Sequence, residues 1–110
     1  MNDNNAIEQK IDQQLKENKV LLYMKGNAAM PRCGFSHKAI QLLNACGAPF
    51  ATIDILEDEE LRNTIKAYKN WPTFPQLYVN GELIGGCDIM QEMYDAGELQ
   101  TLLAPYVSVE

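Results

Sequence analysis

The N-terminal half of the chain alternates between helical and extended spacings of its apolar residues. A first amphipathic helix is predicted by apolar residues four apart: Ile7, Ile11 and Leu15. Asn5 followed by Glu8 is a candidate capping pair for the start of this helix. The unbroken apolar run 20–24 predicts a buried strand, and an irregular loop follows it at 26–32. A broad apolar stripe then predicts a helix over 34–46, which a glycine ends.

A second strand and a third helix are predicted in the middle of the chain. Residues 50–55 form the strand, and four acidic residues at 57–60 open the helix, where negative charge is favoured by the helix dipole. The inner face of that helix is marked by Leu61, Ile65 and Tyr68. The segment 71–75 contains two prolines, which exclude a helix and predict a constrained loop.

A β-hairpin gives the strongest local signal. Residues 76–79 and 82–84 are short apolar-rich runs joined by Asn80-Gly81, the pair that favours a type I′ turn. Asp88 with Gln91 opens a further helix, and a short terminal helix carries Leu99, Leu102 and Leu103. The resulting order, α-β-α-β-α-β-β-α-α, predicts an α/β protein with a mixed sheet, since a β-α-β unit makes a parallel pair and the hairpin adds antiparallel strands.

The composition is that of an ordinary globular domain, and we expect a single domain over residues 1–110. Nine basic and 15 acidic residues give a net charge of −6, which argues against nucleic acid as a partner because phosphate binding needs a basic face. The longest apolar run is too short to span a bilayer, and the first ten residues lack the pattern of a secretory signal. We therefore expect no membrane association and a cytoplasmic protein.

Three cysteines are too few, and odd in number, for a disulfide-stapled scaffold, and no paired C-x-x-C units indicate zinc. Cys46 lies on the apolar stripe of its predicted helix and is interpreted as a packed, inert thiol. His37 follows Cys33 by four residues, but with no further histidine we interpret it as a polar surface residue rather than a metal ligand.

Cys33 lies in the loop directly before a predicted helix. Unpaired backbone N–H groups and the positive end of the helix dipole would lower the pKa of its thiol, and Arg32 would act in the same direction if its side chain approaches. The fourth position of the motif Cys33-Gly-Phe-Ser36 is a serine, so no disulfide can close within the motif. Chemistry at Cys33 must use a second thiol from elsewhere in the chain, from another chain or from a small molecule.

Four motifs together carry a resemblance to a known family: Leu21-Leu-Tyr-Met-Lys-Gly26, Pro31-Arg-Cys-Gly-Phe-Ser36, Trp71-Pro-Thr-Phe-Pro-Gln76 and Gly85-Gly-Cys-Asp88. With these motifs in this order, the chain resembles a single-domain monothiol glutaredoxin of the C-G-F-S class over about residues 6–104. The resemblance implies a thioredoxin-like fold, a four-stranded mixed sheet flanked by helices. The loop 26–31 departs from the family in lacking the first of two prolines often found there.

The resemblance also implies a glutathione site, made by Lys25, Cys33, Phe35, Arg62, Thr73, Phe74, Cys87 and Asp88. Lys25 and Arg62 would lie at the glycine carboxylate, and Phe35 would flank the ligand beside Cys33. Lys66, one turn past Arg62, is interpreted as a solvated charge that could reach this pocket.

The resemblance places the remaining site residues along the rest of the ligand. Thr73 and Phe74 would precede a cis proline, Pro75, and offer the backbone groups of Phe74 to the ligand's cysteine. Cys87 and Asp88 would hold the γ-glutamyl end, where backbone N–H groups suit its carboxylate and Asp88 suits its ammonium. Cys87 could contribute only its backbone, or act as an auxiliary thiol that pairs with Cys33 under oxidation.

A [2Fe–2S] cluster needs about four thiolates, and one chain offers Cys33 as the one well-placed metal ligand. The resemblance implies that two chains and two glutathione molecules complete the set in a homodimer that transfers its cluster to apo iron-sulfur proteins. The chain would then be a cluster carrier with at most weak enzyme activity. The alternatives are a glutathione-dependent thiol-disulfide oxidoreductase, and a regulatory iron-sulfur partner of BolA-like proteins.

Overall fold

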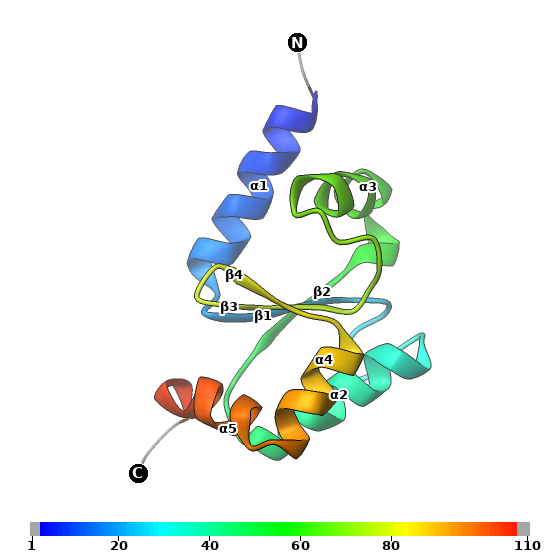
Figure 1. Cartoon of the computed structure of the whole chain (residues 1–110). Helices are drawn as coiled ribbons and strands as arrows, with labels where there is room; N and C mark the ends of the chain where they lie inside the picture. The colour runs from blue at the N-terminus through cyan, green and yellow to red at the C-terminus, as the bar shows by residue number, and fades with distance from the viewer. Residues whose placement is uncertain (1–2, 108–110) are drawn as a thin grey trace.

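A four-stranded mixed sheet forms the centre of the structure, a computed structural model that describes residues 3–107. The strands lie in the order β2-β1-β3-β4 (Figure 1), and their bounds are Val20–Met24 for β1, Ala51–Asp54 for β2, Gln76–Val79 for β3 and Glu82–Gly85 for β4. β1 pairs in parallel with β2 and antiparallel with β3, and β3 pairs antiparallel with β4. This is the mixed sheet that the element order predicts.

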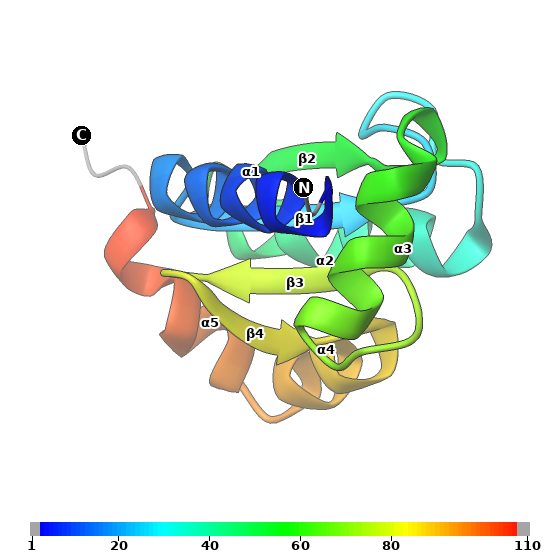
Figure 2. The ribbon, with the colours of Figure 1, turned by 90° about the horizontal axis from the view of Figure 1, so that it is seen from above.

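Helices cover both faces of the sheet. One face carries α1 (Asp3–Glu17) and α3 (Glu59–Tyr68), which lie side by side in Figure 2. The other face carries α2 (Gly34–Cys46), α4 (Cys87–Asp95) and α5 (Glu98–Leu103), seen below the sheet in Figure 1. Two short 3₁₀ turns follow β2 and α5: η1 (Ile55–Glu57) and η2 (Ala104–Tyr106). Within residues 3–107 no helix has the length and apolarity needed to cross a membrane.

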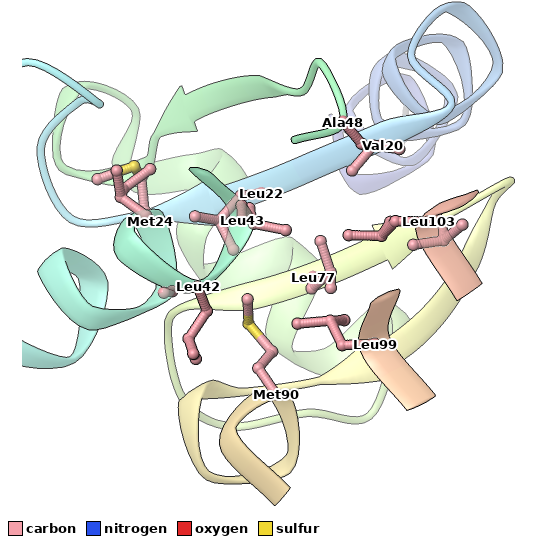
Figure 3. Close-up of a cluster of buried hydrophobic side chains, with 13 residues drawn as sticks. Val20, Leu22, Met24, Leu42, Leu43, Ala48, Leu77, Met90, Leu99 and Leu103 are labelled. Carbon is pink, nitrogen blue, oxygen red and sulfur yellow. The ribbon is translucent and has the colours of Figure 1, made fainter. Parts of the chain in front are cut away.

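The hydrophobic core consists of two clusters, one on each side of the sheet. Alternate residues of β1 supply both: Leu22 packs against α2, α4 and α5 (Figure 3), whereas Leu21 and Tyr23 pack under α1 and α3. All five residues of β1 are buried, which explains why the strand is an unbroken apolar run rather than an alternating one. Each fully buried leucine contributes roughly 1.5–3 kcal/mol to folding.

Local features of the sequence determine where most of the helices and strands begin or end. Asn80 and Gly81 have φ angles of 51° and 83°, both positive as a type I′ turn requires. The second strand ends at Asp54, one residue before the predicted end, because the Asp54 carboxylate accepts the N–H of Leu56 and starts η1. The predicted cap at Asn5 is wrong, because Asn5 lies inside α1, which begins at Asp3.

Candidate functional site

A cleft of about 620 Å³ opens where the end of β1, the start of α2, one side of α3, the 71–75 loop and the start of α4 meet. All eight residues assigned to the site from sequence line it: Lys25, Cys33, Phe35, Arg62, Thr73, Phe74, Cys87 and Asp88. The fold therefore brings together residues from five parts of the chain: the end of β1, the start of α2, α3, the 71–75 loop and the start of α4.

Cys33 is the N-cap residue of α2 and has an extended backbone conformation. Its thiol pKa lies below the ordinary value, chiefly because the backbone N–H of Ser36 stabilises the thiolate, with partial burial opposing this effect. The backbone N–H of Phe35 and the charge of Lys25 also lower the pKa. The predicted contribution of Arg32 is not found: its side chain is exposed, and the cation that acts on the sulfur is Lys25.

Cys33 should therefore be alkylated by iodoacetamide at lower pH than the other two thiols. Because its pKa is lowered, its reactive thiolate fraction rises at a lower pH, whereas burial raises the pKa of Cys46 and of Cys87. Peptide mass spectrometry of the native protein after alkylation across a pH series reports all three thiols in one sample. A profile for Cys33 that coincides with that of Cys46 contradicts the assignment.

Ser36 has a structural role at the position where a dithiol motif carries its second cysteine. Its side chain is fully buried, and its Oγ accepts the backbone N–H of Lys25 at 3.1 Å. This bond ties the first turn of α2 to the end of β1. The serine thus fixes the helix start that stabilises the Cys33 thiolate.

The loop between β1 and Cys33 is closed by backbone hydrogen bonds, although it lacks the first of the two prolines. The N–H of Arg32 donates to the carbonyl of Lys25 at 2.9 Å, and Asn27 Oδ1 accepts the N–H of Met30 at 2.9 Å. At its base, the N–H of Gly26 donates to Asp54 Oδ1 at 2.9 Å. Sequence analysis did not identify Asp54, whose carboxylate joins the loop to the end of β2.

Three basic side chains line the cleft. Lys25 follows β1, and Arg62 and Lys66 lie one turn apart on α3. Among the described residues, the buried Nε of Arg62 has no hydrogen-bond partner. Three cations and an unused donor lining an open cleft fit an anionic ligand group. The loop at the side of the cleft has the expected cis peptide bond between Phe74 and Pro75.

The N-terminus of α4 also lines the cleft. The Cys87 side chain is 7% exposed, and its pKa is raised, first by burial and further by the charges of Asp88 and Cys33, while Lys38 opposes the rise. Asp88 is exposed beside it. Whether the Cys87 thiol pairs with Cys33 under oxidation stays a prediction.

Two other residues considered from sequence lie outside the cleft. Cys46 is half-buried at the end of α2 and packs against the core, as the apolar stripe predicted, and burial raises its pKa. His37 is exposed on α2. Over residues 3–107, no three histidine, cysteine or acidic side chains gather into a group that could hold a metal ion.

A thiol at the N-terminus of the helix after the first strand, facing a cis-proline loop across a cleft, defines a thioredoxin-like protein. Two solved structures share this architecture. Reduced apo GrxS14 from poplar matches with a TM-score of 0.80 and 46% identity, covering 91% of this chain and 92% of that one. A buckwheat glutaredoxin–glutathione complex matches with a TM-score of 0.84 and 22% identity, covering 96% of each chain.

The sequence comparisons agree with the fold. The family model for glutaredoxin matches residues 20–84. Glutaredoxin 4 of Escherichia coli strain K12 is 57% identical over 95 residues, which span 86% of this chain and 83% of that protein. The chain belongs to the glutaredoxin family, and its Cys33-Gly-Phe-Ser36 motif places it among the monothiol members.

Proposed function

We propose that this monothiol glutaredoxin binds glutathione along the cleft, with the ligand sulfur next to Cys33. The basic side chains of Lys25, Arg62 and Lys66 suit the glycine carboxylate, and the nine-residue helix α4 offers backbone N–H groups to the γ-glutamyl carboxylate. Asp88 lies in the first turn of α4, where it suits the ligand's ammonium group. The buckwheat glutaredoxin of the same fold was solved as a complex with glutathione, which supports this assignment.

Removing the charge of Lys66 should weaken glutathione binding about two- to fivefold, the effect of one partly exposed ion pair. Lys69→Ala is the matched control, because it removes the same charge from the end of α3, but its Nζ lies over the Tyr68 ring rather than in the cleft. Isothermal titration calorimetry of wild type, Lys66→Ala and Lys69→Ala gives the three affinities. Equal losses in both variants show a general charge effect and contradict a contact at Lys66.

We further propose that two copies of the chain hold one [2Fe–2S] cluster between them. Such a cluster takes about four thiolate ligands. The observation that carries the proposal is that the cleft exposes a single thiol with a lowered pKa, Cys33, while Cys87 is buried with a raised pKa. Cys33 from each copy and the sulfur of each bound glutathione complete the set.

The cluster is cargo in this proposal, and the protein transfers it to apo iron-sulfur proteins. Glutathione binds without a covalent bond to the chain, so two of the four ligands can be exchanged for thiolates of a recipient. Phe35, next to Cys33, is 62% exposed and provides an apolar contact at the mouth of the cleft for the second copy. A BolA-like protein in place of the second copy is the further partner we propose. The chemistry requires a reduced thiol and free glutathione, which the cytoplasm supplies.

Anaerobic reconstitution with iron and sulfide, with and without glutathione, tests the proposal. We expect a coloured dimer by visible absorption and size-exclusion chromatography only when glutathione is present, and transfer of the colour to an apo-ferredoxin on mixing. A colourless monomer under both conditions contradicts cluster binding. A coloured dimer that forms equally well without glutathione contradicts the ligand set.

A second candidate function is favoured by the lowered pKa of Cys33. The thiolate would attack the glutathione sulfur of a protein–glutathione mixed disulfide, release the protein thiolate and form a Cys33–glutathione disulfide. A second glutathione thiolate would then attack that disulfide, giving oxidised glutathione and regenerating Cys33. A glutathione-coupled reductase assay separates the candidates: rapid turnover at low protein concentration supports the oxidoreductase, and slow turnover supports the carrier.

A further inference from the structure

A buried glutamine lies beneath the cleft, at the end of the 71–75 loop. Gln76 is the first residue of β3 and is 0% exposed. Its Nε2 donates to the carbonyl of Trp71 at 3.0 Å and to that of Thr73 at 3.2 Å, while its Oε1 accepts the hydroxyl of Tyr78 at 2.9 Å. The carboxamide is therefore satisfied on both sides, and both of its donors are used by the loop.

Only one orientation of the Gln76 side-chain amide is consistent with these hydrogen bonds. Two carbonyl oxygens can accept hydrogen bonds only from the NH₂ side of the amide, so the oxygen of Gln76 must face Tyr78. The Tyr78 hydroxyl is then the donor. Burial raises the pKa of Tyr78, so this hydroxyl keeps its proton at neutral pH.

A second buried tyrosine lies next to Tyr78 but has a different partner. Tyr23 packs edge-on against Tyr78, with ring centroids 5.5 Å apart and an angle of 84° between the rings. Its hydroxyl donates to Gln14 Oε1 of α1 at 2.7 Å. The two tyrosines share one packing environment, yet only Tyr78 is bonded to the residue that holds the loop.

The bonds to Gln76 also set the direction of the main chain in the cleft wall. The peptide between Thr73 and Phe74 is a planar trans unit, so its C=O and N–H point in opposite directions. Because the carbonyl of Thr73 points to Gln76, the N–H of Phe74 points away from it, and Phe74 lines the cleft. The prolines at 72 and 75 have no N–H with which to hold the loop in another way.

We propose that Gln76 is a positioning residue for glutathione, and that the Tyr78 hydroxyl fixes Gln76 in the orientation that presents the N–H of Phe74 to the ligand. This inference rests on the proposed glutathione binding. It predicts that the buried Tyr78 hydroxyl affects the affinity for glutathione, although the ligand does not touch it.

Tyr78→Phe tests the proposal, with Tyr23→Phe as the matched control. Both variants keep a buried ring and lose one hydroxyl, but only Tyr78→Phe leaves the oxygen of Gln76 without its donor. Tyr78→Phe should weaken glutathione binding by roughly 3- to 10-fold, the effect of one buried hydrogen bond, and Tyr23→Phe should not. Trp71 is the chain's single tryptophan and lies in the loop, so acrylamide quenching of its fluorescence should rise in Tyr78→Phe alone.

Equal affinities in the two tyrosine variants, or equal quenching of Trp71, overturn the proposal. Gln76→Leu should weaken binding at least as much as Tyr78→Phe, because it also removes the two bonds to the loop. The double variant should add little to Gln76→Leu alone, because the Tyr78 hydroxyl acts through Gln76. Additive losses contradict the shared interaction. If the wild type itself fails to bind glutathione, the proposed function is wrong, and the quenching comparison still decides whether Tyr78 positions the loop.

Discussion

We expect Cys33→Ser to abolish the visible absorption of the anaerobically reconstituted protein and to leave it monomeric. This is the largest effect that we expect from a single substitution. A serine hydroxyl stays protonated at neutral pH, so the cluster loses both of the ligands that the two copies supply. The variant should fold normally, because Cys33 occupies the N-cap position of α2 and serine is among the favoured residues there. Circular dichroism and urea unfolding check the fold, and absorption with size-exclusion chromatography checks the cluster.

The other two cysteines provide the controls. Cys46→Ser should keep the cluster and the dimer, since Cys46 lies outside the cleft at the end of α2. Cys87→Ser should also keep the cluster, because the proposed contact of Cys87 with glutathione uses its backbone. A cluster retained in Cys33→Ser, or lost in Cys46→Ser, contradicts the assignment of Cys33 as the ligand.

Gly26→Ala should lower the free energy of unfolding by about 2–4 kcal/mol, combining the cost of a left-handed alanine with that of overpacking. Gly26 has φ +85°, and a Cβ there would meet the carbonyl oxygen of Met30 and lie 2.7 Å from the backbone nitrogen of Arg32. Both atoms belong to the closed loop before Cys33, so they cannot move without breaking its hydrogen bonds. Urea unfolding followed by circular dichroism measures the loss.

Alanine substitutions at two other glycines distinguish the cost of the left-handed backbone from the cost of overpacking. Gly81 has φ +83° with open space around it, so Gly81→Ala should cost only the left-handed backbone, about 1–2 kcal/mol. Gly34 has neither a positive φ nor a neighbour within 4 Å, so Gly34→Ala should change stability little. A Gly26→Ala protein as stable as Gly81→Ala contradicts the close approach of the loop to Gly26.

The elements of the fold were predictable because their signals are local. The unbroken apolar run of β1, the Asn80-Gly81 turn and the paired prolines of the 71–75 loop each determine their own short segment. The cap at Asn5 was wrong because a capping pattern of two residues does not exclude a helix that begins earlier.

Other parts of the site depend on contacts between distant segments and could not be read from local patterns. Arg32 is next to Cys33 in the sequence, yet the cation that acts on the sulfur is Lys25, eight residues earlier. Asp54 and Gln76 support the loops around the cleft from two different strands. Only the folded chain shows which main-chain groups their side chains meet.

The net charge of −6 is also uninformative about the cleft. Lys25, Arg62 and Lys66 line it with a single acidic residue, Asp88, so the cleft is locally basic on an acidic protein. The charge that matters for a small anionic ligand is the local one, because salt screens more distant charges over roughly 10 Å.

Native mass spectrometry of the protein reconstituted anaerobically with glutathione tests the central claim most directly. The account predicts one complex that contains two chains, one [2Fe–2S] cluster and two glutathione molecules, and that yields monomers when the cluster is lost. A cluster-bearing dimer without glutathione, or a single chain that holds a cluster by itself, would contradict it.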